Sequence, residues 1–391
     1  MKFNSGLIAL AIGAFGIGVT EFAPMGMLPV IASDLHISIP SAGLLISAYA
    51  MGVLIGAPLM TLTTARFDRR TLLIALMGIF TLGNALSALA DGYWMLMAAR
   101  VITSFNHGAF FGVGSVVAAS LVPPDKRAGA VAAMFTGLTV ATIGGVPLAT
   151  WVSEAIGWRS AFAGIAGVGA LAMLSLRLAL PSLPSTGGGE MRGELRVLTR
   201  APVMMALALT TIGFGGVFTV FTYIVPILRD VTHGSTGYIT AMLMLFGIGA
   251  TIGNGLGGRL ADRSVERTLM TMLAIMALTL LGFTVLMQWP VTAAIAILIW
   301  GIASFAIVPP LQMRVMDAAS DAPNLASAMN IGAFNLGNAI GAALGGGVIG
   351  AGLGLPAVSL AGAAMAALAL VTLLVSRRRA DAFAQREEAL T

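Results

Sequence analysis

The chain has 391 residues, of which 58% are hydrophobic and 9% are charged. A soluble domain carries roughly 25% charged residues, so this chain has too few charges to cover a water-facing surface. The net charge of +5 does not indicate nucleic-acid binding, because 18 of the 21 Lys and Arg residues fall in alternate loops and the two tails. The chain contains no cysteine, which excludes disulfides and thiolate chemistry.

Apolar segments long enough to cross a bilayer recur along the whole chain. A membrane-spanning helix needs about 20 mostly apolar residues, and twelve such helices with short loops use nearly the entire sequence. We therefore predict an all-α integral membrane protein with twelve transmembrane helices. The predicted spans are 5–32, 41–64, 71–90, 93–122, 127–152, 160–181, 202–229, 236–260, 268–288, 290–316, 325–350 and 354–376. The first span is too long for a signal peptide and is predicted to be retained.

The distribution of basic residues predicts the orientation. All Lys and Arg residues except Arg100, Arg159 and Arg229 fall on one set of alternate loops or in the tails. Cytoplasmic loops of membrane proteins carry an excess of Lys and Arg. We expect both termini to lie in the cytoplasm, as an even number of spans requires.

Matching positions indicate two parallel repeats. Gly52 recurs as Gly249 and His36 recurs as His233, in each case 197 residues later. Parallel halves of this kind place a substrate site between them, near the middle of the membrane. The predicted parts are an N-terminal six-helix bundle (1–181), a cytoplasmic linker (182–201) and a C-terminal six-helix bundle with a short basic cytoplasmic tail (202–391).

Glu21 is the only one of the 16 acidic residues that lies well inside a predicted span. A carboxylate in hydrocarbon is costly unless it faces a cavity, pairs with another group or takes up a proton. Burial favours the protonated form, so such a group can bind and release protons near neutral pH. We interpret Glu21 as a proton carrier. The alternative is a hydrogen bond to a neighbouring helix that serves structure alone.

The fourth span contains Arg100, Asn106 and His107. Arg100 and His107 are seven residues apart, so two helical turns place them on one face, about 10 Å apart along the axis. Glu21 should lie at a depth between them. We predict that Glu21, Arg100 and His107 act together in proton coupling. The alternatives are that Arg100 extends to the lipid headgroups and that His107 only joins two helices by a hydrogen bond.

Small residues, among them Gly137, recur at every fourth position of the fifth span. Such a stripe lets helix backbones approach closely. Gly144, Gly145 and Pro147 interrupt this helix near its end, which predicts a kink with a role in gating. The eighth span carries a similar stripe that includes Gly253.

Further polar and aromatic residues are candidates for lining a cavity between the halves. No second-half span contains an acid, but the eleventh span contains three amides, including Asn338. Amides can orient a polar ligand, although hydrogen bonding between helices is their commoner use. The predicted cavity residues are Met25, Asn106, Phe110, Tyr223, Trp300, Gln312, Asn330 and Asn335.

Signatures of enzymes and ATP-driven pumps are missing from the sequence. There is no phosphate-binding Gly-rich loop that ends in Lys-Ser or Lys-Thr, no metal-spaced His pair and no Gly-x-Ser-x-Gly elbow. We expect no catalytic residues, no bound metal and no cofactor.

Five short motifs are distinctive: Gly18–Phe22, Ile39–Gly43, Asn106–Gly112, Gly144–Pro147 and Phe334–Gly341. With these motifs the whole chain resembles the major facilitator superfamily, in its drug:proton antiporter branch, and particularly the bacterial arabinose-efflux and sugar-efflux-like permeases. The resemblance implies a monomeric multi-pass protein of the bacterial inner membrane. Its expected partners are a small-molecule substrate, protons and the lipid bilayer, with no nucleic acid.

A loop motif of this superfamily, Gly-x-Leu-Ala-Asp-Arg, is matched by the segment from Gly258 to Arg263. In the family, the Asp and its Arg partners latch the cytoplasmic ends of helices. The first-half copy departs from the pattern because Ala65 stands at the Asp position, with Asp68 nearby. The predicted gate residues are Arg66, Asp68, Arg69, Arg70, Asp262, Arg263 and Arg267.

The resemblance favours an alternating-access, proton-coupled exporter of drugs, sugars or metabolites. Arg100 matches a fourth-helix Arg that is implicated in proton transfer in the family. The fifth span matches the antiporter motif loosely, with Ala141-Thr142 where that motif has Gly-Pro. A proton-coupled uptake symporter shares every feature except this motif. A membrane receptor of the same fold without transport is the alternative from another class, and an intramembrane enzyme has the least support.

Overall fold

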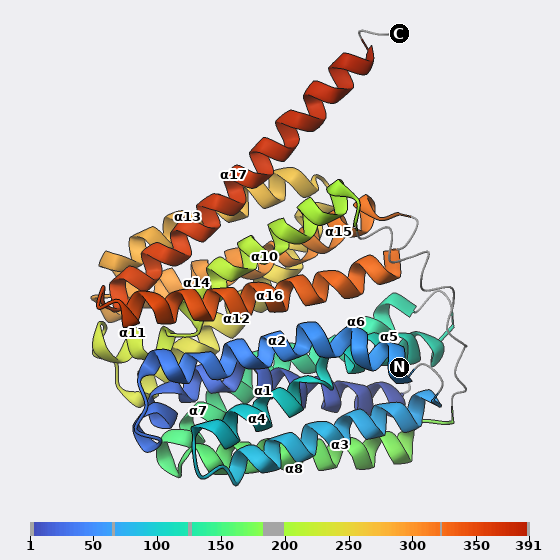
Figure 1. Cartoon of the computed structure of the whole chain (residues 1–391), viewed down its shortest axis with the longest axis vertical. Coiled ribbons are helices and arrows are strands. Elements are labelled where there is room, and N and C mark those ends of the chain that lie inside the picture. Colours follow the sequence, from blue (N-terminus) through green and yellow to red (C-terminus); the bar gives the residue numbers. More distant parts are fainter. Residues whose placement is uncertain (1–3, 65–66, 124–126, 183–198, 321–322, 389–391) are drawn as a thin grey trace.

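The computed structural model describes residues 4–64, 67–123, 127–182, 199–320 and 323–388 (Figure 1). The predicted linker therefore falls mostly outside the described residues, as does Arg66. The helices are α1 (Ser5–Asp34), α2 (Ile39–Thr64), α3 (Arg69–Ala88), α4 (Tyr93–Ser104), α5 (His107–Ser120), α6 (Arg127–Val140), the π-helical turn η2 (Ala141–Gly145), α7 (Val146–Ala155), α8 (Trp158–Ala179), α10 (Ala201–Phe221), α11 (Ile224–Asp230), α12 (Thr236–Ala261), α13 (Val265–Leu286), α14 (Pro290–Ala306), α15 (Val308–Ala318), α16 (Pro323–Gly350) and α17 (Leu355–Glu388).

Eleven helical segments of the described chain are long and apolar enough to cross a membrane. The remaining predicted span corresponds to α16, a helix of 28 residues that packs along both α10 and α2. This helix carries the buried amides of Asn330, Asn335 and Asn338 and is less apolar for that reason. The predicted all-α membrane fold is confirmed.

Several spans are broken near their middle. The fourth span divides into α4 and α5 at Phe105-Asn106, directly before His107. The tenth span divides into α14 and α15 just before Pro309, which has no backbone N–H to continue the helical ladder. The fifth span contains the η2 turn between α6 and α7. A π turn or break in a helix is frequent at functional sites.

The two halves form adjacent bundles, with α1 to α8 in one and α10 to α17 in the other (Figure 1). His36 and His233 are the only non-glycine residues in the described chain with positive φ, at 52° and 55°. Each follows the last helical residues of a repeated span. The same uncommon backbone conformation thus recurs 197 residues apart, which supports a parallel repeat.

The halves share a hydrophobic core on one side of the molecule. We call the side where α1 begins the terminus side and the opposite side the far side. Phe22, Met25 and Leu28, toward the far-side end of α1, belong to one buried cluster with many residues of the second half. Ala42 and Ile46 of α2 join this cluster. The halves are therefore packed together toward the far side.

Candidate functional site

The carboxyl group of Glu21 lies where the two halves meet. The residue is 8% exposed and is the only acidic residue that is buried in the described part of the chain. Its Oε2 lies 3.9 Å from Nε2 of His107 in the same half. Asn338 of α16, in the other half, donates a hydrogen bond to Oε1 over 3.5 Å. Each carboxyl oxygen therefore faces a different half.

A continuous polar network extends from this carboxyl into the first half. Nδ1 of His107 is 3.1 Å from the hydroxyl of Tyr49 on α2. The guanidinium carbon of Arg100 stacks 4.2 Å from the centre of the Tyr49 ring. Arg100 also donates to the Thr20 hydroxyl over 3.1 Å, and Thr20 donates to Asn84 over 2.6 Å. The three predicted proton-coupling residues thus belong to one network.

Arg100 is buried inside the protein and does not extend to the lipid headgroups. The residue is 1% exposed, and its guanidinium also lies 5.9 Å from the centre of the Phe162 ring. Its Nε and Nη2 atoms have no hydrogen-bond partner among the residues that the structure describes. Buried donors of a cation are costly to leave unpaired, so these atoms are available for water, a carboxylate or a substrate.

The local sequence explains how His107 reaches this position. The Asn106 side chain donates to the backbone carbonyl of Thr103, at the break between α4 and α5. On α2, Gly52 faces Ser104 so closely that a Cβ would lie 2.0 Å from its Oγ. The small residue lets α2 approach the break, and Tyr49 is thereby brought against His107.

The equivalent positions of the second half are apolar. At the spacings that relate the halves, Glu21, Tyr49 and Arg100 correspond to Phe218, Phe246 and Trp300. The ring centroids of Phe246 and Trp300 are 4.7 Å apart, in the place of the stacked Tyr49 and Arg100. The second half thus replaces an ionisable network by an aromatic one.

A narrow pocket between the halves is lined mainly by phenylalanine residues. It is bounded by Phe22, Thr142, Val146, Val217, Phe218, Phe221, Leu243, Phe246 and Phe305. The Thr142 hydroxyl is the only polar side-chain group among them, and it donates to the Thr139 carbonyl over 2.9 Å. The lining is therefore apolar, and it offers few hydrogen-bond partners to a ligand rich in hydroxyl groups.

The predicted cavity residues do not form one group. Met25 lies in the core shared by the halves, whereas Phe110 packs within the first half, against Gly13. Tyr223 donates to the Ala342 carbonyl over 2.8 Å, at the break between α10 and α11. Trp300 is fully buried, and no described residue forms a hydrogen bond with its Nε1.

The predicted amides serve different roles. Asn330 donates to Gln312 over 2.7 Å, which joins α16 to α15 within the second half. Asn335 donates to the Ile331 carbonyl of its own helix over 3.0 Å. Sequence reasoning singled out Asn338 only as a polar group, and it did not identify Tyr49 or the pairing of Asn338 with Glu21. A pairing across 317 residues leaves no local pattern in a sequence.

The predicted glycines of the fifth span differ in their surroundings. A Cβ on Gly137 would lie 2.1 Å from the Ala11 carbonyl, so this glycine permits close packing of α6 on α1. Gly145 is similarly close to Val19, whereas Gly144 has nothing within 4 Å. Pro147 is buried in the first turn of α7, directly after η2.

The first-half residues of the predicted gate stabilise helix ends within that half. Asp68 caps α3 by accepting from the Thr71 N–H over 3.0 Å, and it also accepts from Ser182 over 3.1 Å. Arg70 donates to the Arg177 carbonyl of α8. Arg69 lies in the first turn of α3.

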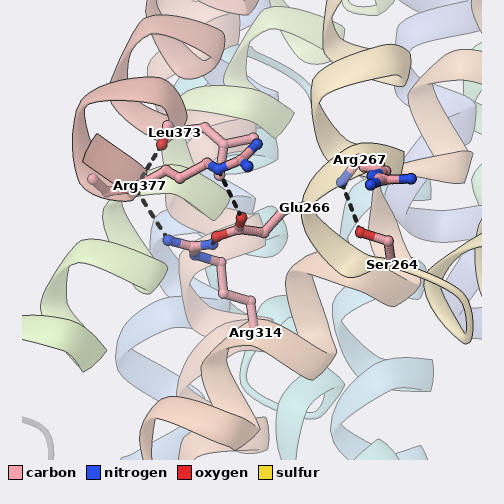
Figure 2. Close-up of polar contacts among 7 residues, drawn as sticks. Ser264, Glu266, Arg267, Arg314, Leu373 and Arg377 are labelled. Atoms are coloured by element: carbon pink, nitrogen blue, oxygen red, sulfur yellow. Dashed lines mark hydrogen bonds and ion pairs between the residues drawn. The ribbon is translucent and has the colours of Figure 1, made fainter. Parts of the chain in front are cut away.

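In the second half, the predicted gate residues Asp262, Arg263 and Arg267 are exposed. Figure 2 shows the backbone N–H of Arg267 donating to the Ser264 hydroxyl. It also shows a cluster of ion pairs around Glu266. Glu266 of α13 is 3.2 Å from Arg314 of α15 and 3.6 Å from Arg377 of α17. Glu266 therefore joins three second-half helices on the terminus side.

The family model described as "Major Facilitator Superfamily" matches residues 10–332. The chain is 56% identical to the "Inner membrane transport protein YdhP" of Escherichia coli K12, over 97% of both chains. It is 33% identical to a "Probable sugar efflux transporter" of Helicobacter pylori P12, over 93% of both chains. A bacterial homologue of the human lysosomal transporter Spinster, solved in an inward-facing and unoccupied conformation, has a similar fold, with a TM-score of 0.72 at 16% identity over 96% of both chains.

Proposed function

This chain belongs to the major facilitator superfamily, and from that membership and the network around Glu21 we propose that it exports a small molecule in exchange for protons. The observation that carries the proposal is a buried carboxyl group in contact with both halves of the molecule. We propose that Glu21 carries the proton, with the terminus side in the cytoplasm and the far side in the periplasm. An inner-membrane position agrees with the name of the E. coli relative.

The contacts of Glu21 support alternating access. An ionised carboxylate accepts the hydrogen bond of Asn338 and attracts the Arg100 guanidinium. Protonation removes the charge and weakens both interactions, so that Arg100 can attract another polar or anionic ligand. Substrate entering from the cytoplasm and a proton entering from the periplasm would thus favour different arrangements of the same groups.

Contacts between the halves support an arrangement that is closed on the far side. Arg229 of α11 pairs with Glu154 of α7, and Thr236 of α12 donates to the same carboxylate. Met25 and Leu28 lie in the shared core on this side. In contrast, the ion pairs of Glu266 on the terminus side remain within the second half.

The pocket between the halves supports a substrate with an apolar or aromatic face. A site that leaves the hydroxyl groups of a ligand unpaired loses about 1–3 kcal/mol for each buried group. The lining offers one hydroxyl and five phenylalanine rings. We therefore propose that this chain prefers flat, lipophilic solutes, although one relative is named as a probable sugar efflux transporter.

The proposal is tested by transport in proteoliposomes. A thermal-stability screen of the purified protein, with sugars and planar aromatic compounds, first provides a ligand. The expected result is that an imposed pH gradient drives uphill movement of this ligand opposite to the protons. Glu21→Gln should abolish this movement but leave the protein folded, whereas Asp91→Asn, at an exposed residue, should transport normally. Uphill, proton-driven transport by Glu21→Gln would refute the role of the carboxyl group.

The same preparation separates the rival functions. For an uptake symporter, solute and protons move in the same direction, and inside-out and right-side-out vesicles distinguish the two directions. For a receptor of the same fold, ligand binding occurs without any pH-linked flux.

A further inference from the structure

Asn338 joins Glu21 to the second half through a contact that the repeat does not duplicate. The two residues lie on α1 and α16, and both are buried. The residue of the second half that corresponds to Glu21 is Phe218, which has no charge. The positions that correspond to Asn338 fall between Leu138 and Ala141 and hold no amide or charged residue. The pair of Glu21 and Asn338 therefore has no counterpart in the repeat.

The amide of Asn338 is only half satisfied. Its Nδ2 donates to Glu21, but its Oδ1 is buried without a hydrogen-bond partner in the described part of the chain. Asn338 is only 3% exposed. Buried polar atoms are nearly always paired. The unpaired oxygen of Asn338 therefore indicates that this amide forms different hydrogen bonds in another arrangement of the protein.

The two charge states of a carboxyl group need opposite partners. The ionised form only accepts hydrogen bonds, whereas the protonated form also donates one. An asparagine amide can serve both states, because rotation about its last bond exchanges the N–H donor for the oxygen acceptor. The bond to the ionised form is roughly twice as strong as the bond between neutral groups.

We propose that Asn338 is the positioning residue through which the charge on Glu21 controls the contact between the two halves. This inference rests on the proposed role of Glu21 as the proton carrier. When Glu21 is ionised, the charge-assisted bond holds α1 and α16 together. When Glu21 is protonated, the amide rotates and the weaker bond lets the halves separate.

The other titratable groups around Glu21 belong to the first half. His107 of α5 lies 3.9 Å away, and Tyr49 of α2 contacts His107. Arg100 of α4 connects through Thr20, the neighbour of Glu21 on α1. The side chain that α16 directs at the carboxyl is the neutral amide of Asn338. A proton bound by Glu21 therefore affects the second half through this amide.

Spin labels can follow the contact without a known substrate. The chain has no cysteine, so Ser120→Cys and Ser320→Cys give one label in each half. Both serines are exposed near the ends of repeated spans on the terminus side. The distance distribution between the labels is measured by double electron–electron resonance, in lipid nanodiscs, at acidic and at alkaline pH.

We expect the distances to change with pH in the double-cysteine protein, and we expect this response to be lost in Glu21→Gln and in Asn338→Leu. Asn335→Leu is the matched control, because Asn335 lies on the same helix, is equally buried and bonds only to its own backbone. Asn338→Ser, which is too short to reach the carboxyl, replaces Asn338→Leu if that variant does not fold.

The possible failures are distinguishable. A full pH response in the folded Asn338 variant, with the response lost in Glu21→Gln, would overturn the role of Asn338 and leave the proton carrier intact. A response lost equally in Asn335→Leu would also overturn it, because any apolar change on α16 would then have the same effect. A response that survives Glu21→Gln, or no response in the parent protein, would contradict the proposed function itself.

Discussion

At the scale of single residues, Tyr49 connects the central groups: its hydroxyl lies 3.1 Å from Nδ1 of His107, and its ring stacks 4.2 Å from the guanidinium carbon of Arg100. Glu21 was recognisable in the sequence because a lone acid inside a hydrophobic span is costly. Arg100 and His107 were recognisable as polar residues of one helix face. Tyr49 gave no comparable signal, because a tyrosine in a membrane span is ordinary. Its position between His107 and Arg100 depends on how α2 packs on α4.

Tyr49→Phe tests whether the Tyr49 hydroxyl affects the rate and the pH profile of proton-driven transport. The substitution keeps the ring that stacks on Arg100 but removes the hydrogen bond to His107. Because one hydrogen bond contributes about 1 kcal/mol, we expect proton-driven transport to change roughly fivefold and its pH profile to shift. The measurement is the transport rate against pH. Tyr93→Phe, which removes a bond to the Ser41 carbonyl elsewhere, should leave the profile unchanged.

At the scale of helices, hydropathy predicted the spans because each must cross the same thickness of lipid. The breaks within the spans were harder to predict. Gly144 and Pro147 indicated irregularity in the fifth span, but the break before His107 has no proline and depends on side-chain packing and capping. The gate motif likewise identified the loop after α12, whereas the ion pairs form around Glu266, which lies outside the motif.

The glycine stripe of α12 gives a prediction about stability. A Cβ on Gly253 would lie 2.1 Å from the Ile302 carbonyl of α14, whereas a Cβ on Gly255 would have nothing within 4 Å. Overpacking of this kind costs about 1–3 kcal/mol. We expect Gly253→Ala to lower the thermal unfolding temperature of the purified protein, and Gly255→Ala to leave it unchanged or raise it. Equal temperatures for the two variants would show that the close approach of α12 and α14 is not needed.

At the scale of the whole molecule, the repeat was predictable from matched spacings, because both halves keep the same loops and glycines. The unequal chemistry of the halves was only partly predictable. The lack of acids in the second half is visible in the sequence, but the aromatic lining of the pocket requires the fold. How the halves meet on the far side also comes from the structure, through Arg229 and Glu154.

Glu154→Gln tests the closure of the far side. The variant removes the charge that pairs with Arg229 across the halves. We expect the halves to separate there more often, so that a cysteine placed at the buried Ala42 reacts several-fold faster with a membrane-impermeant maleimide. Asp34→Asn is the control, because Asp34 pairs with Arg159 within one half over 2.6 Å. Equal labelling rates in all three proteins would show that the ion pair of Glu154 and Arg229 does not hold the far side closed.

The central claim is that Glu21 binds and releases a proton as the halves rearrange. Infrared difference spectra of the protein in lipid, parent minus Glu21→Gln, isolate the carbonyl stretch of this protonated carboxyl group. We predict that the band is present at acidic pH, disappears as the pH rises, and changes together with the distance between the halves. A band that is constant at every pH, while proton-driven transport proceeds, would contradict the account.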